Sequence, residues 1–559
     1  MGPREFNTAS LPFSAPFVAF PFFPLPRALP VPSFRRGHIP ARSPSMTPFR
    51  KRELLLSLKN ATVEACFSVP MLNLTLTQFP FAIGFAVVAL HWGDRAIGLL
   101  AAVPFLCNAF QPPLTYLLQR RFSIYQIILL GFVFNALPWA FVWLLPWTGD
   151  HRHWIFALIV TTSTLANSVC AVAWSAAMSD LVPLNIRGTY FGKRNLVFAF
   201  WTLIVVLAAG QIAKRFDNSL TVFGFIFATA ALARLCGMFF LTRMKFPAKV
   251  MERRPQTQSL SDYLAVLKDR NYLWLMLFIG SWNMCINLGQ PFYSKYLLDP
   301  AGLGMDMGQL TIFTTISAFG GLLSLRAWGV LSDRFGNKPV MFTCALAWGV
   351  TALAAWIFAG PERHAHLYAN YFVTGFMFAG FQLCQFTLMI KMVPTEGNAH
   401  YISVFVAFTS LLTAIGPVMG GLLMGFLSSR ASYGSLLGQP ILGYHLLFGL
   451  SLFAALIALH LLQQLKEPAE RPVRELVRQM KSMREFNPVV GLSSIAQYMF
   501  TPRALTRFAR DTARTLRRQT SALSDVGEEL VGGGLRAVKE TFDRERPESP
   551  VKPRGDRGS

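Results

Sequence analysis

The chain has 559 residues, of which 53% are hydrophobic and 14% are charged, and its formal net charge is +24. A soluble protein with a mean hydropathy of +0.40 would have too little polar surface to cover itself, so the composition favours a polytopic membrane protein. The excess of Lys and Arg then indicates basic cytoplasmic loops rather than a nucleic-acid partner.

Residues 1–49 contain a proline every few positions, with phenylalanines between them. Proline interrupts helices, so we expect a disordered leader there rather than a membrane span or a secretory signal. A second methionine, Met46, precedes the basic run Arg50-Lys51-Arg52, which is typical of the flank of a first membrane helix. Translation from either Met1 or Met46 is compatible with this pattern.

Apolar segments then recur, each near the ~20 residues that cross about 30 Å of hydrocarbon. They predict an all-α membrane protein with twelve transmembrane helices in two six-helix bundles, over residues 50–243 and 271–465. A cytoplasmic linker over 244–270 and a basic, partly helical tail over 466–559 complete the chain. The predicted spans are 60–89, 95–118, 123–147, 153–180, 192–213, 220–242, 271–297, 307–332, 338–359, 365–391, 401–428 and 440–464.

The connections between the spans differ in charge. The leader, the linker and the other even-numbered connections carry most of the Lys and Arg, for example Arg120, Arg121 and Lys193. Because positively charged loops stay on the cytoplasmic side, we expect both termini in the cytoplasm.

Sequence landmarks recur in the same order in the two predicted bundles. The pairs are Pro80-Phe81 with Pro291-Phe292, Arg121-Phe122 with Arg334-Phe335, and Val182-Pro183 with Val393-Pro394. Their nearly constant offset predicts parallel repeats, and such repeats place a solute site near the bilayer midplane between them.

Polar side chains inside spans are costly against lipid and should face the interface between the bundles. The first and seventh spans carry them at helical repeats, and Pro291 can break the seventh helix. We expect them to line the path of a small solute, with interhelical hydrogen bonding as the alternative. The candidates are Glu64, Ser68, Thr75, Gln78, Asn167, Trp174, Trp282, Asn283, Asn287, Gln290, Gln382 and Gln385.

Few charged residues lie inside the spans. Glu64 is the one carboxylate well inside the first bundle, so it is the candidate for proton coupling, and pairing with a loop arginine is the alternative. Arg234 and Arg326 have no obvious partner in the sequence and can either attract an anionic solute or extend toward the cytoplasm. We favour extension for Arg326 and leave both interpretations open for Arg234.

Small residues inside the spans are interpreted as packing residues. The seven cysteines lie singly in apolar runs without metal-ligand spacing. Gly416, Gly420 and Gly421 in the eleventh span predict close helix contacts.

The connection after the eighth span reads Gly329-Val-Leu-Ser-Asp333-Arg334-Phe-Gly336-Asn-Lys338-Pro339. It resembles the G-x-x-x-D-R-x-G-[RN]-[KR]-P signature of the major facilitator superfamily. The resemblance implies that Asp333 caps the eleventh span while Arg334 and Lys338 reach carboxylates or headgroups. This latch would hold in the outward-facing state and break on opening inward.

A second segment, Asp180–Asn195, reads D-L-V-P-L-N-I-R-G-T-Y-F-G-K-R-N. It resembles the D-L-V-P-x-x-x-R-G-x-[YF]-F-G-x-R-N segment of a largely uncharacterised bacterial branch of that superfamily, which implies a bacterial inner membrane. Asp180 can pair with Arg187 or Arg194 across this loop, either as a gate or as a structural tie.

These features predict a secondary active or facilitative transporter that moves a small solute by alternating access. The alternatives are a membrane scaffold or sensor with the same fold, and a lipid flippase. The chain lacks GxSxG, Walker and HExxH motifs, so we expect no enzyme, no cofactor and no metal.

We expect a monomer in the lipid bilayer with no nucleic-acid partner. The tail carries a basic stripe that can bind anionic lipids or remain solvated. The stripe consists of Arg503, Arg507, Arg510, Arg514 and Arg517.

Overall fold

The computed structural model describes residues 48–251, 266–393, 398–430, 432–436, 439–467 and 476. By contacts between Cα atoms the chain divides into two units, residues 1–34 with 52–497 and residues 35–51 with 498–559. The helices described below lie in the first unit from residue 52 onward. The predicted leader, most of the linker and the basic stripe of the tail lie outside the described residues.

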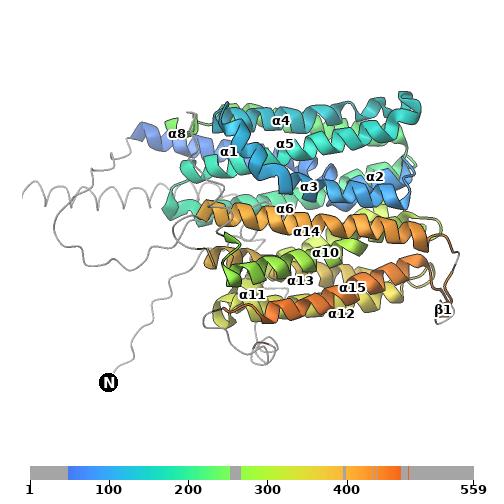
Figure 1. Cartoon of the computed structure of the whole chain (residues 1–559). Helices are drawn as coiled ribbons and strands as arrows, with labels where there is room; N and C mark the ends of the chain where they lie inside the picture. The colour runs from blue at the N-terminus through green and yellow to red at the C-terminus, as the bar shows by residue number, and fades with distance from the viewer. Residues whose placement is uncertain are drawn as a thin grey trace, which may run out of the picture. The chain divides into compact units, whose positions relative to one another are not determined.

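Helices make up nearly all of the described chain (Figure 1). In the N-terminal half these are α1 Pro48–Leu74, α2 Pro80–Val88, α3 Asp94–Gln119, α4 Ile124–Ala140, α5 Arg152–Leu181, α6 Leu184–Arg215 and α7 Leu220–Thr242, with short 3₁₀ turns η1 Val142–Trp147 and η2 Gly149–His151. A short helix, α8 Ala248–Met251, follows.

The C-terminal half contains α10 Arg270–Leu298, α11 Met307–Phe335, α12 Asn337–Ile357, α13 His366–Lys391, α14 Asn398–Leu427 and α15 Gly443–Gln463. Two short antiparallel strands, β1 Ser435–Leu436 and β2 Gln439–Pro440, lie between α14 and α15. We call the end of the helices where α2 meets α3 and α10 meets α11 the outer end, following the orientation that the sequence predicts.

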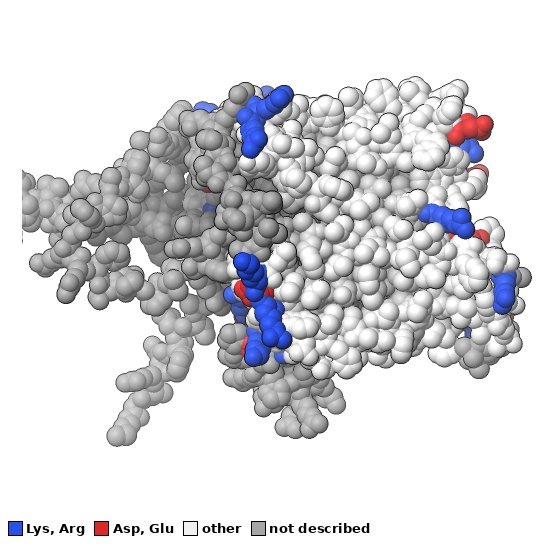
Figure 2. Space-filling model, in the orientation of Figure 1, with Lys and Arg blue, Asp and Glu red and all other residues white. Residues whose placement is uncertain are grey.

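The helix lengths agree with a membrane protein. In the described part of the chain, 11 helices are long and apolar enough to cross a membrane. The remaining predicted span corresponds to α1 and α2 together. On the face drawn in Figure 2, charged side chains gather near the two ends of the helices and leave an uncharged band between them. The predicted fold class, twelve spans built only from helices, is consistent with this arrangement.

The first predicted span is broken rather than continuous. The sequence predicts one helix over 60–89, but α1 ends at Leu74 and α2 begins at Pro80. Pro80 has no N–H to donate and disfavours helical geometry in the residue before it. The side chain of Thr77 donates to the carbonyl oxygen of Leu100, so the neighbouring helix α3 holds the break in place.

The seventh predicted span shows the opposite difference. Pro291 can break a helix, but α10 is continuous from Arg270 to Leu298. Proline removes one hydrogen bond, whereas packing along a buried helix involves many contacts. Pro291 is itself buried, and α10 packs against both α14 and α15. The packing on both sides explains why the helix tolerates this proline.

Helix α6 begins earlier than the sequence predicts. It starts at Leu184, eight residues before the predicted start at 192. Pro183 precedes it as the N-cap, and its fixed backbone angle suits the start of a helix. The arginines of the D-L-V-P segment therefore lie on a helix rather than in a loop.

Candidate functional site

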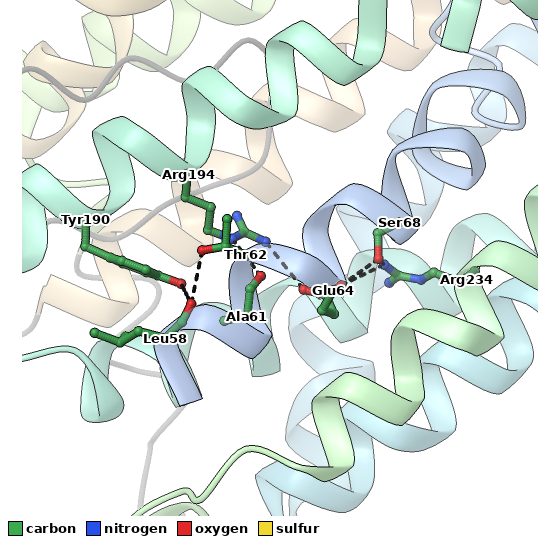
Figure 3. Close-up of polar contacts among 8 residues, drawn as sticks. All are labelled: Leu58, Ala61, Thr62, Glu64, Ser68, Tyr190, Arg194 and Arg234. Atoms are coloured by element: carbon green, nitrogen blue, oxygen red, sulfur yellow. Dashed lines mark hydrogen bonds and ion pairs between the residues drawn. The ribbon is translucent and has the colours of Figure 1, made fainter. Parts of the chain in front are cut away.

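A buried ion-pair network joins three helices of the N-terminal half (Figure 3). Glu64 of α1 lies between Arg194 of α6 and Arg234 of α7. The shortest distances are 3.5 Å from Arg194 Nη2 to Glu64 Oε2 and 3.5 Å from Arg234 Nη1 to Glu64 Oε1. The Glu64 side chain is 3% exposed, and the two arginine side chains are 9% and 6% exposed. We call these three residues the Glu64 network.

Hydrogen bonds fix the Glu64 network to the backbone of α1. Ser68 donates to Glu64 Oε1 and accepts from Arg234 Nη1, so it bridges the two charged groups. Arg194 Nε donates to the carbonyl oxygen of Ala61 over 3.3 Å. One turn earlier on α6, the Tyr190 hydroxyl donates to the carbonyl oxygen of Leu58 over 3.1 Å. The N-terminal part of α6 is therefore tied along one face of α1.

The Glu64 network has two guanidinium groups and a single carboxylate. Burying a charge is costly unless polar or aromatic groups compensate for the lost water. Aromatic rings supply such compensation here. The Arg194 guanidinium lies 4.3 Å from the ring centre of Trp174, and that of Arg234 lies 3.6 Å from the ring centre of Phe132. These cation–π contacts stabilise the excess positive charge.

The structure therefore brings Arg194, which sequence analysis assigned to the gate, together with the solute-path candidates Glu64, Ser68 and Trp174. Arg194 lies on α6 and pairs with Glu64, so it is placed on the helix rather than in the loop where sequence analysis offered it, or Arg187, as a partner of Asp180. Arg234 had no sequence partner because its partner, Glu64, is distant in the chain. Only helix packing reveals the pair.

Arg187, near the start of α6, is buried and contacts the end of α5. Its Nη2 donates to the carbonyl oxygens of Ser179 and Val182, which are among the last acceptors of that helix. Burial lowers the pKa of Arg187, and the attraction of the Asp180 carboxylate opposes that shift. The two hydrogen bonds of Arg187 thus tie the start of α6 to the end of α5.

Two solute-path candidates of the first predicted span do not lie on the helical face that carries Glu64 and Ser68. Thr75 and Gln78 follow the end of α1 at Leu74, so they do not continue the row of Glu64 and Ser68. The Thr75 hydroxyl donates to the carbonyl oxygen of Met71 and helps to close the last turn. This correction follows directly from the break before Pro80.

In the C-terminal half, Trp282 does not belong to a polar path. It is fully buried, with its ring centre 5.5 Å from that of Phe381 and 5.9 Å from that of Trp348. The indole of Trp282, on α10, therefore packs against α12 and α13. Trp282 lies beside the polar residues of α10 in the sequence, but it belongs to the hydrophobic core.

The other polar candidates occupy different environments. Asn287 is buried and donates to the carbonyl oxygen of Asn283 over 2.8 Å, whereas Gln290 is exposed. Gln382 and Gln385 on α13 are half-buried, and Gln385 Oε1 has no hydrogen-bond partner among the described residues. Asn167 on α5 is buried. In the described part of the chain, no hydrogen bond joins the polar residues of α10 to those of α13.

The signature loop after α11 uses a carboxylate that sequence analysis missed. Asp333 and Arg334 are exposed in this conformation. Glu467 instead accepts hydrogen bonds from the backbone N–H groups of Asn337 and Lys338 at the start of α12, over 3.1 and 2.7 Å. A lone Glu after the last span carries no distinctive sequence signal, which is why it was overlooked.

Ion pairs also link the two halves at the outer end. Lys295 at the end of α10 pairs with Asp94 at the start of α3, and both side chains are largely buried. Lys214 at the end of α6 lies 3.1 Å from Asp306, the N-cap of α11. Next to this pair, Gln211 Nε2 donates to the carbonyl oxygen of Gly308 over 3.2 Å.

Glycines bring helices of the two halves into close contact at the same end. Helix α14 lies alongside α3 (Figure 1). A Cβ at Gly98 of α3 would collide with the carbonyl oxygen of Pro417 and lie 2.8 Å from Gly421 Cα. On the other side of α14, Gly416 and Gly420 pack against the backbone of α10. The predicted close packing of these glycines is confirmed.

Within the described residues, no group of three or more His, Cys, Asp or Glu side chains is placed to hold a metal ion.

Sequence comparison gives both a family and individual relatives. The Major Facilitator Superfamily sequence model matches residues 65–322 and 300–510. The uncharacterized MFS-type transporter YuxJ of Bacillus subtilis is 24% identical over 271 residues, 46% of this chain and 64% of that protein. Solute carrier family 22 member 22 of Mus musculus is 30% identical over 107 residues, 19% of this chain and 18% of that protein. The chain thus aligns with less than two thirds of either relative.

Solved structures share the arrangement of helices. The nucleoside transporter NupG has a TM-score of 0.52 at 16% identity, covering 74% of this chain and 98% of its own. The xylose transporter XylE from E. coli, in a partially occluded inward open conformation, has a TM-score of 0.53 at 14% identity, covering 75% and 100%. Such distant likenesses establish the fold alone. With the family match over most of its length, this chain belongs to the Major Facilitator Superfamily.

Proposed function

We propose that the protein is a secondary active or facilitative transporter that moves a small solute across a membrane by alternating access. The observation that most directly supports this proposal is the set of contacts between the two halves at the outer end, above all Asp94–Lys295 and Lys214–Asp306. Both pairs lie at helix ends and join the two halves, so they suit contacts that form and break in each cycle.

The distribution of the other polar contacts supports the same mechanism. Glu64, Arg194 and Arg234 all belong to the N-terminal half, so their network would stay intact while the halves move relative to one another. Parallel six-helix repeats that rock about a central site fit this division. The two arginine partners of Glu64 favour its pairing role over proton coupling.

The polar residues of α5, α10 and α13 are the proposed solute path. They are Asn167, Asn283, Asn287, Gln290, Gln382 and Gln385. Amides can both donate and accept hydrogen bonds, so this set suits a polar solute. The basic connections support cytoplasmic termini. The resemblance of the Asp180–Asn195 segment to a bacterial branch supports a bacterial inner membrane. In the outward-facing state, Asp333 and Arg334 would form the latch that the signature implies.

The first experiment is a ligand screen on the purified full-length chain. Thermal unfolding in detergent is followed with sugars, amino acids, nucleosides and organic anions, since a solute that binds the folded state raises the unfolding temperature. Each stabilising solute is then tested for flux in proteoliposomes. Saturable flux that Asp94→Asn reduces supports the proposal.

Other outcomes contradict the proposal. Movement of labelled lipid without flux of any stabilising solute would identify a flippase. Absence of both activities in a protein that unfolds cooperatively would favour a scaffold or sensor. A flux that follows the imposed pH gradient would contradict the pairing role of Glu64 and return it to proton coupling.

A further inference from the structure

Glu467 occupies an unusual position just beyond the last helix. Its side chain is 5% exposed, although the residue lies in the segment that follows α15. Oε1 accepts from the backbone N–H of Asn337 over 3.1 Å and from Asn337 Nδ2 over 2.8 Å, and Oε2 accepts from the backbone N–H of Lys338 over 2.7 Å. Both carboxylate oxygens are therefore used at the N-terminus of α12.

The start of α12 needs an acceptor from elsewhere in the chain. Its N-cap is Gly336, which has no side chain to accept from the first N–H groups of the helix. Gly336 also has φ +95°, a backbone conformation that side chains rarely adopt, so a capping Ser or Asp would be strained there. Glu467 supplies the missing acceptor, and its negative charge suits the positive end of the helix dipole.

Neighbouring contacts make residues 465–467 a strap across the cytoplasmic end of the C-terminal half. Asn271 at the start of α10 and the backbone of Lys466 exchange two hydrogen bonds over 3.0 Å each. Lys338 Nζ donates to the carbonyl oxygen of Leu465 over 2.8 Å. Lys391 at the end of α13 lies 3.7 Å from Glu467 Oε1. The strap thus contacts the ends of three helices besides α15.

One of the helices next to the strap reaches the outer contacts with the N-terminal half. Helix α11 begins at Met307 and ends at Phe335, and only Gly336 separates it from Asn337, which Glu467 binds. Near its beginning, Thr311 is buried and packs against Gly210 of α6. A single continuous helix therefore connects the Glu467 site with the outer interface.

We propose that Glu467 is a positioning residue for the transport cycle. It fixes the start of α12, one residue beyond the end of α11, and so restrains the tilt of α11 that would separate Thr311 from Gly210. Loss of the carboxylate then makes the outer end open more readily. This inference rests on the proposed alternating access, but it needs no knowledge of the solute.

The test uses a reporter thiol at the outer interface of the full-length protein. Thr311→Cys places a thiol where it is buried while the outer end is closed, and a membrane-impermeant maleimide labels it only after opening. In lipid nanodiscs, Glu467→Gln in this background should raise the labelling rate by about threefold to tenfold, because the amide keeps one acceptor oxygen and only part of the hydrogen bonding of the carboxylate is lost. The same protein without Thr311→Cys gives the background from the native cysteines.

Lys466→Ala is the matched control, because the two hydrogen bonds of Lys466 use its backbone and its side chain is exposed. It should leave the labelling rate unchanged, and Glu467→Asp should give an intermediate rate. A lower unfolding temperature for Glu467→Gln with an unchanged labelling rate would mean a merely structural cap and overturn the inference. If position 311 never reacts in any background, the outer end does not open, and alternating access fails as well.

Discussion

At the scale of single residues, the Glu64 network depends on charge balance. One carboxylate serves two guanidinium groups, and the faces of Trp174 and Phe132 compensate for the remaining positive charge. Removing one member of a buried ion pair lowers the stability of the fold by more than the pair's net contribution to that stability, because the remaining charge is left without a partner.

We therefore expect Glu64→Gln to destabilise the protein by about 3–5 kcal/mol, since it leaves Arg194 and Arg234 buried without their carboxylate. Urea or thermal unfolding in detergent measures the change. Glu362→Gln, at an exposed loop position, is the control and should have little effect. Adding Arg234→Met to Glu64→Gln should cost less than the sum of the two single changes, and strict additivity would count against the ion pair.

At the scale of helices, backbone contact decides how closely α3 and α14 approach. Gly98 faces the backbone of α14 without a side chain between them. A methyl group there has no flexible neighbour to displace, because the nearest atoms are those of Pro417 and Gly421 backbone. The helices must then move apart or shift along one another.

Gly98→Ala should consequently weaken the closed outer end. In the Thr311→Cys background we expect faster maleimide labelling, by roughly tenfold if the clash costs about 1.4 kcal/mol. Gly449→Ala on α15 is the matched helical control, because a Cβ there has nothing within 4 Å. Equal labelling rates for the two alanine variants would contradict a role of the α3–α14 contact in outer closure.

At the scale of the whole molecule, an ion pair at the outer end joins the two halves, with the negative charge on one half and the positive charge on the other. Asp94 belongs to the N-terminal half and Lys295 to the C-terminal half, and their side chains are 11% and 13% exposed. A partly buried pair of this kind depends on both partners being present, whichever half carries which charge.

This symmetry leads to a charge-swap experiment. Asp94→Lys alone places two positive charges together and should reduce the flux of an identified solute, because the outer end can no longer close normally. Adding Lys295→Asp should restore a substantial part of the flux and of the unfolding temperature. A double variant as inactive as the single one would show that the pair does not act by charge.

The sequence alone determined the membrane class, the approximate spans and the family signature, because hydrocarbon selects long apolar helices regardless of their packing. It also marked Gly416, Gly420 and Gly421 as close contacts. Tertiary structure decided what the polar residues do. Trp282 packs in an aromatic core, and Pro291 lies inside a continuous, packed helix. The first predicted span is interrupted before Pro80.

The partners of charged residues were likewise decided by the fold. Glu64 meets Arg194 and Arg234, and Glu467 caps α12, across separations of more than a hundred residues. Periodicity along a chain reports which face of a helix is polar, but not which other helix that face meets. Only the packing of the helices brings such distant charges within a few ångströms of each other.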